Sequence, residues 1–144
     1  MVKKYIIFIF VLLFLSNCKK DENEAVFVIS IVSTSPVELQ EFQENIMVTI
    51  QYEHSEGYVG FFDPDYLSLE VKDSRLSNPD YYHLIPVFPP NETLIVQGEL
   101  LLEIDAPFIF GNGLTETLTY IIRIQDKDKV WSNKVTTALI TVKK

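Results

Sequence analysis

The chain has 144 residues and a mass of 16.6 kDa, which fits one domain. Hydrophobic residues make up 47% of it, enough to build a buried core, so the composition argues against a disordered chain. The formal charge of −8 argues against nucleic acid as a partner, because phosphate neutralisation needs clustered Lys and Arg. A single Cys excludes internal disulfides and Cys-based zinc sites, and two His leave few ligands for a His-bound metal.

The N-terminus has the parts of an export signal. A short basic stretch with Lys3 and Lys4 precedes an uninterrupted apolar run over residues 5–15. A membrane-spanning helix needs roughly 20 apolar residues, so this run suits the core of a signal peptide. It ends in Leu15-Ser16-Asn17-Cys18, which resembles the lipobox of bacterial lipoproteins. The resemblance implies that residues 1–17 are removed and that Cys18 carries acyl chains such as palmitate; an ordinary signal peptide with a chance Cys is the alternative.

Residues 18–24 are polar and charged, which predicts a flexible tether. The stretch Lys19-Lys20-Asp21-Glu22 also resembles the export signal that follows the Cys in surface lipoproteins of Bacteroidota. That resemblance implies an outer-membrane lipoprotein exposed on the cell surface, with the membrane as its first partner; a spacer without address value is the alternative. Two or three acyl chains anchor a protein stably, whereas one does so only marginally.

From residue 25 onward the hydrophobic pattern has a period of two. Ile46, Val48 and Ile50 alternate with more polar residues, as Leu69 and Val71 do further along the chain. Such alternation is typical of strands with one buried and one solvated face, and we expect no substantial helix. Seven strand segments are predicted, at residues 25–34, 45–53, 66–72, 81–87, 94–104, 116–125 and 134–142.

Turn signals rich in Pro, Gly, Asn and Asp separate these segments. Seven short strands in a chain of this length predict an all-β fold, a seven-stranded antiparallel β-sandwich over residues 25–144. A closed barrel would also fit the count. Pro86 favours the sandwich, because Pro cannot donate to a strand ladder and needs an edge, which a barrel lacks.

Two stretches resemble immunoglobulin-like (Ig-like) and fibronectin type III domains. Tyr120-Ile121-Ile122-Arg123-Ile124 resembles their strand F, which begins with a Tyr, and Trp131-Ser132-Asn133-Lys134-Val135 resembles the entry to their last strand. The whole chain resembles uncharacterised lipoproteins of Bacteroidota with a single Ig-like domain. The resemblance implies that loops 53–65, 88–93 and 125–133 lie at one end of the sandwich.

That end would hold four loop aromatics, Tyr58, Phe61, Phe62 and Trp131. Exposed aromatics on loops make large contacts at small entropic cost, so they could stack on a glycan or anchor an envelope protein. The alternative is that they fold inward and cap the core. The opposite end has fewer aromatics, mainly Phe42, Phe108 and Phe110.

The same loops carry acidic residues that suggest a calcium site. Hard cations take six to eight oxygen ligands, which carboxylates from two loops can supply. Solvated turn residues are the alternative, because Asp favours turns in any case. The candidate ligands are Glu53, Glu56, Asp63, Asp65, Asp126 and Asp128.

The sequence lacks the catalytic motifs that carry a clear mechanism: a nucleophile elbow, a phosphate-binding loop or a paired-His metal motif. We therefore expect a non-catalytic binding or structural module anchored at the cell envelope, not an enzyme. Glycan or nutrient capture beside an uptake system is one alternative, and a calcium-stabilised adhesion or assembly module is another.

Overall fold

The computed structural model describes residues 27–55, 57, 59–86 and 96–144. The described chain is all-β, and no helix in it could cross a membrane. The expected signal peptide, Cys18 and the tether lie outside the described residues, as do Glu56 and Tyr58. The strands are β1 (Phe27–Ser35), β2 (Glu38–Gln40), β3 (Ile46–His54), β4 (Leu69–Asp73), β5 (Asp80–Tyr82), β6 (Val96–Ile104), β7 (Thr115–Leu118), β8 (Tyr120–Ile124), β9 (Val135–Thr136) and β10 (Ile140–Lys143).

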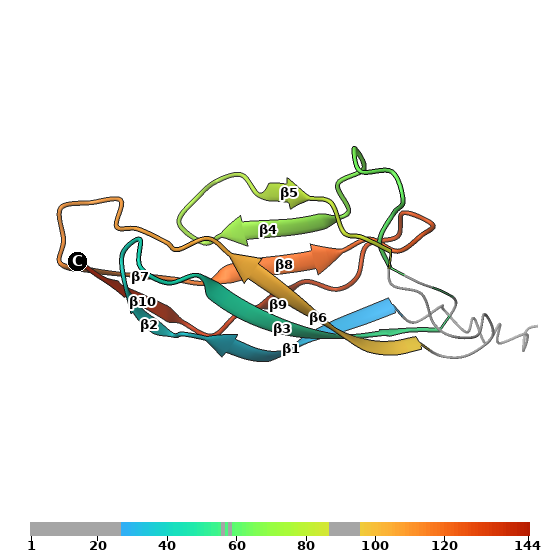
Figure 1. Cartoon of the computed structure of the whole chain (residues 1–144), viewed down its shortest axis with the longest axis horizontal. Coiled ribbons are helices and arrows are strands. Elements are labelled where there is room, and N and C mark those ends of the chain that lie inside the picture. Colours follow the sequence, from blue (N-terminus) through green and yellow to red (C-terminus); the bar gives the residue numbers. More distant parts are fainter. Residues whose placement is uncertain (1–26, 56, 58, 87–95) are drawn as a thin grey trace, which may run out of the picture.

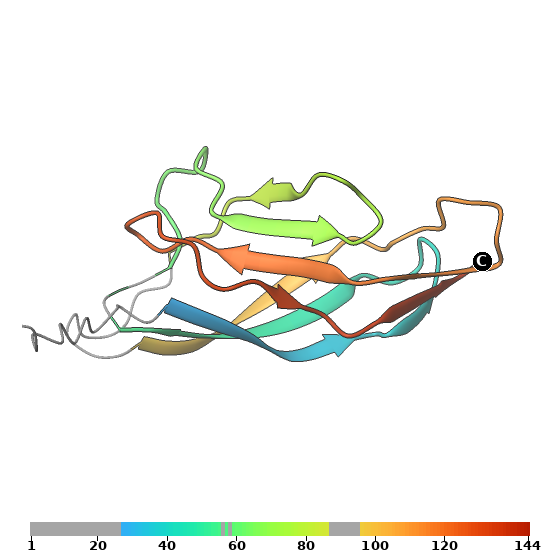
Figure 2. The same ribbon diagram turned by 180° about the vertical axis from the view of Figure 1, so that it is seen from behind.

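The strands form two facing layers, a sandwich-like arrangement (Figure 1). One layer has the order β1-β3-β6, and the other has the order β5-β4-β8-β9. A third small sheet, β2-β10-β7, extends beyond them toward the C-terminus (Figure 2). Neighbouring strands pair antiparallel except β2 and β10, which are parallel. The expectation of an all-β fold of mainly antiparallel strands is therefore confirmed.

The core lies between the layers and follows the alternation in the sequence. Ile46, Val48 and Ile50 of β3 are almost completely buried, as are Ile122 and Ile124 of β8. Each such side chain contributes about 1.5–3 kcal/mol when it leaves water, so these two strands supply much of the driving force for folding.

The described chain has more strands than the seven segments expected. Segments 116–125 and 134–142 are each divided in two, and the short β2 was not anticipated. The division after β7 has a local cause, because side-chain hydroxyls replace ladder partners there. Thr119 N donates to Ser74 Oγ at 3.0 Å, and Tyr120 N donates to Thr137 Oγ1 at 2.9 Å.

The two long sides of the sandwich differ. On one side Asn133 joins the layers: its Nδ2 donates to Ile29 O at 2.9 Å, and Ile29 N donates to its Oδ1 at 2.8 Å. On the other side β5 and β6 are the edges of their sheets. The strand expected over residues 81–87 is shorter than predicted: β5 is an edge strand that ends at Tyr82, so Pro86 lies beyond it. With such edges, the described strands do not close into a barrel.

Candidate functional site

The loops that follow β3 and β8 meet at the end of the molecule where β1 begins (Figure 1). We call this end, residues 59–68 and 125–133, the base. Val59 forms an antiparallel bridge with Asp126, and the Tyr66 hydroxyl donates to Gln125 Oε1 at 2.8 Å. The predicted meeting of these two loops is therefore confirmed, while loop 88–93 lies outside the described residues.

Asp126 organises the base from inside. The residue is only 4% exposed, and its Oδ2 lies 3.0 Å from Nε2 of the buried His54. Its Oδ1 accepts the backbone N–H groups of Asp128 at 2.9 Å and Val130 at 2.8 Å. The carboxylate thus holds the β8–β9 loop in shape, using both oxygens for contacts within the protein.

The other predicted calcium ligands are dispersed. Asp63 and Asp65 are exposed, and Asp63 Oδ1 accepts the Asp65 N–H at 3.0 Å, as turn residues do. Asp128 is exposed and pairs with Lys127, whereas Glu53 accepts from Gln97 at 3.3 Å. Within the described parts of the chain, no three His, Cys, Asp or Glu residues are grouped to hold a metal ion. Calcium binding stays a prediction, to be tested in solution.

The predicted aromatics have different surroundings. The Phe61 ring packs on Tyr66 with centroids 4.0 Å apart, and the Trp131 ring is covered on one face by the Arg123 guanidinium at 4.2 Å. Phe62 is 74% exposed, and Tyr58 lies outside the described residues. Phe61 is therefore half-buried against a residue of its own loop, whereas Phe62 is largely exposed.

Trp131 ends a row of side chains that crosses the outer face of the four-stranded sheet. Tyr81 is paired in register with Glu70, which is paired with Arg123, and Arg123 Nη2 donates to Glu70 Oε2 at 2.5 Å. Burial raises the pKa of Glu70, but hydrogen bonds from Arg123 and Tyr81 outweigh it, so that pKa lies below its ordinary value. Glu70 and Arg123 stand at the polar positions of alternating strands, which is the signal that could have revealed this row.

The opposite end carries an exposed aromatic cluster. We call this end, residues 41–45, 74–79 and 105–114, the tip. The rings of Phe42 and Phe108 stack at 5.2 Å, and Phe110 meets Phe108 edge-on at 5.1 Å. The three residues are 65%, 43% and 46% exposed, respectively. Phe42 also holds a backbone φ of 62°, in the left-handed region that bulky side chains rarely adopt.

Arg75 packs against the aromatic cluster at Phe110. Its Nη2 donates to Asp73 Oδ2 at 2.6 Å and its Nη1 to Glu116 Oε1 at 3.1 Å, while its guanidinium lies 4.1 Å from the Phe110 ring centre. Burial lowers the pKa of Arg75, but Asp73 and Glu116 outweigh this and raise it overall. The Arg75 guanidinium therefore stays charged, and it lies against the Phe110 ring.

A cavity of about 380 Å³ opens beside the cluster. The residues that line it include Arg75, Phe108, Phe110, Tyr82 and Tyr120. Burial, followed by the charge of Asp73, raises the pKa of Tyr120 to about 12, so its hydroxyl stays protonated and can donate. Chemically, the tip offers apolar contact area with a few fixed polar groups, as binding sites commonly do.

Neither a family model, nor a curated protein, nor a solved structure matches this chain. From the sequence we predicted that the binding aromatics lie at the base, where the structure shows Phe61 packed on Tyr66 and Trp131 covered on one face. We did not predict a binding role for the tip. The signal was present in Phe42, Phe108 and Phe110, but their convergence depends on loops that are distant in the chain.

Proposed function

We propose that this chain is a non-catalytic lipoprotein of the outer membrane, anchored through Cys18, that presents an Ig-like domain to a protein partner at the cell surface. The strand order supports the Ig-like assignment. Early strands β1 and β3 share a layer with β6, while β4 and β8 share the other with β9, as in sandwiches of this class. The export and lipobox pattern in residues 1–18 supports the anchor.

The observation that carries the proposal is the exposed cluster of Phe42, Phe108 and Phe110 at the tip. Contiguous apolar surface of this kind marks interaction sites, and each Å² removed from water contributes about 25 cal/mol. Aromatic residues beside an Arg are also the residues that most often dominate protein interfaces. A protein partner therefore suits the tip better than a glycan does.

The position of the cluster adds to this argument. Residues 18–24 precede β1 in the chain, and β1 begins at the base. An anchor at Cys18 then joins the domain at the base and leaves the tip facing away from the membrane.

The anchor is tested by metabolic labelling with an alkyne fatty acid. The full chain should take up the label, and the Cys18→Ser variant should lose it and leave the membrane fraction. Labelling that persists in Cys18→Ser would reject the anchor.

The binding role is tested by chemical cross-linking of the full chain in intact cells of its host. Replacing Phe42, Phe108 and Phe110 together by Ser should abolish the cross-linked adducts of the wild-type chain. Phe62→Ser is the control, since Phe62 is a phenylalanine at the base that is more exposed than any of the three at the tip. Adducts that survive the triple change, or disappear with Phe62→Ser, would contradict a binding tip.

A second candidate is glycan capture through the row that ends at Trp131. One observation favours it: the Trp131 ring lies beside the partly exposed Arg123 guanidinium, which the buried Glu70 holds in place. Isothermal titration with soluble glycans tests it. Binding that is lost in Trp131→Ala and kept in the tip triple variant would support capture at this face instead of the tip.

A third candidate, stabilisation by calcium, is distinguished from protein binding and from glycan capture by a thermal melt with calcium and with chelator. An ion that binds only the native state must raise the midpoint. Asp63, Asp65 and Asp128 are the described candidates that are exposed to solvent. An unchanged midpoint would remove the structural ion from the account.

A further inference from the structure

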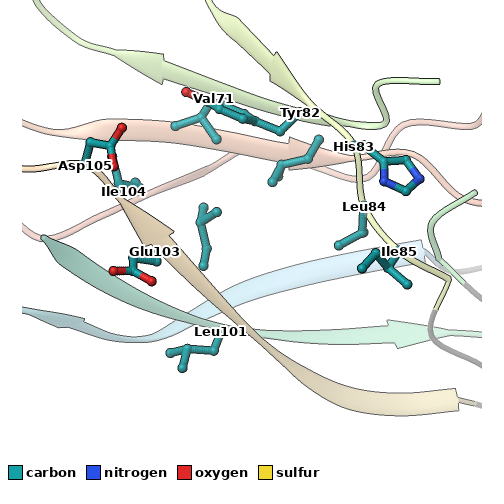
Figure 3. Close-up of a pocket in the computed structure, with 11 residues that line it drawn as sticks. Val71, Tyr82, His83, Leu84, Ile85, Leu101, Glu103, Ile104 and Asp105 are labelled. Atoms are coloured by element: carbon teal, nitrogen blue, oxygen red, sulfur yellow. The ribbon is translucent and has the colours of Figure 1, made fainter. Parts of the chain in front are cut away.

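A groove runs along the open side of the sandwich, away from the side joined by Asn133. It has a volume of about 580 Å³ and lies between β6 of one layer and β4–β5 of the other. Figure 3 shows Val71 and Tyr82 facing Ile104 and Asp105 across it, with Leu84 and Ile85 at one end. Leu84, Leu102 and Ile104 are core residues that remain partly uncovered here.

Among the described strands, β6 is the edge of its sheet and borders the groove. β6 is nine residues long and pairs with β3 along its whole length, while its other side faces the groove. Proteins usually protect such an edge with Lys, Pro or a bulge, because the free N–H and C=O groups recruit another strand. In β6 neither Lys nor Pro occurs, and Leu100-Leu101-Leu102 lies at its centre.

The charges around the edge are of one sign. Glu99 and Glu103 are exposed on the outer face of β6, and Asp105 follows at its end. Of the described residues that line the groove, none is Lys or Arg. A strand lying along β6 would place one set of its side chains over Leu102 and Ile104 and the alternate set beside the carboxylates.

We propose that β6 accepts an extended segment of another protein, in which apolar residues alternate with Lys or Arg, as an added strand. Backbone hydrogen bonds to the β6 edge supply part of the affinity, and alternate side chains supply the specificity. This contact adjoins the tip at Asp105 but does not use Phe42, Phe108 or Phe110, and it does not depend on the lipid anchor.

Charge argues against a second copy of this chain as the occupant. An antiparallel β6–β6 pair centred on Leu100 would make Glu99 a diagonal neighbour of the second copy's Glu99 and Glu103. Like charges at such positions are destabilising, whereas a cationic strand would place opposite charges there. The acidic edge therefore selects a basic partner and disfavours self-pairing.

The test uses the full chain, purified in neutral detergent, and a fluorescent nine-residue peptide in which Lys alternates with Val. Fluorescence anisotropy should show binding at least tenfold tighter than to the same peptide with Glu in place of Lys. The double change Glu99→Lys and Glu103→Lys should lower the affinity for the Lys peptide at least tenfold. The double change Asp63→Lys and Asp65→Lys makes the same charge change in an exposed loop outside the groove, and it should alter the affinity for the Lys peptide less than twofold.

Two N-methylated forms of the peptide separate strand pairing from attraction by charge alone. A strand pairs through one edge, so methylating one alternate set of its amides should abolish binding while methylating the other set leaves it. Equal binding of both forms, or of the Lys and Glu peptides, would overturn the proposal. Slow hydrogen exchange at every β6 amide of the free monomer, or a dimer cross-linked through position 101, would overturn it by showing another occupant.

Discussion

The base and the tip both carry aromatic and charged loop residues, yet they use them differently. At the base, Asp126 contacts the buried His54, Phe61 packs on Tyr66 and Arg123 covers one face of Trp131. These side chains therefore make their main contacts within the domain. At the tip, Phe42, Phe108 and Phe110 touch chiefly one another and solvent. The contrast teaches that residue type identifies candidates, while the available partners decide which of them can bind a ligand.

The largest expected effect is at the base. Asp126→Ala removes the carboxylate that contacts His54 and accepts the N–H groups of Asp128 and Val130. Hydrogen bonds to a charged group contribute about 1.5–3 kcal/mol each, and the two N–H donors are only partly buried, so we expect a total loss of about 3 kcal/mol in the free energy of unfolding. Urea unfolding measures it. A loss below about 1 kcal/mol would show that the base is not held by this carboxylate.

Two glycines compare the packing of the ends directly. A Cβ on Gly60, which has a φ of +90°, would lie 2.7 Å from the carbonyl oxygens of Leu84 and Ile85. Gly111 at the tip has nothing within 4 Å of that position. We expect Gly60→Ala to cost about 2 kcal/mol and Gly111→Ala to stay within about 0.5 kcal/mol of wild type. Equal losses of stability for the two variants in a thermal or urea melt would contradict the claim that the base is packed more tightly than the tip.

The Glu70–Arg123 pair gives a dependence on pH. Because the folded-state pKa of Glu70 is lowered, its stabilisation is full above the unfolded pKa and is lost as pH falls through the folded value. We expect Glu70→Gln to cost about 1.5 kcal/mol at pH 7 and progressively less below about pH 4. Urea melts across pH measure the difference, with the exposed Glu44→Gln as control. A difference that does not shrink in acid would contradict the pairing.

The smallest expected effect is at the tip and has the opposite sign. Phe42→Gly relieves a left-handed backbone that costs a bulky residue about 1–2 kcal/mol. It also removes a ring stack worth about 0.5–1.5 kcal/mol, so we expect the melt to show stability raised by about 0.5 kcal/mol. The same variant should form fewer adducts in cells. A destabilised protein would show that Phe42 serves the fold.

The sequence was informative about the fold because alternation is a local property. Ile46, Val48, Ile50, Ile122 and Ile124 are buried as their alternation predicts, whereas the strand expected over residues 81–87 ends at Tyr82, before Pro86. The three-residue β2 is too short to carry a pattern, and the break after β7 depends on hydroxyls of Ser74 and Thr137. Neither could be read from local periodicity.

The site was less accessible to sequence reasoning. Asp126 has the spacing of a metal ligand, but its partner His54 lies 72 residues away. The tip is formed where Phe42 meets Phe108, a pairing that only the folded chain creates. Counting loop aromatics favoured the base because the count cannot separate a ring that packs inward from one that faces water.

The most direct test of the account is carbene footprinting of the full chain, purified and in intact cells. We predict strong modification of Phe42, Phe108 and Phe110 in the purified protein and protection of all three in cells, with Phe62 modified in both. Tip residues that are unmodified in the purified chain, or modified equally in cells, would contradict a binding tip.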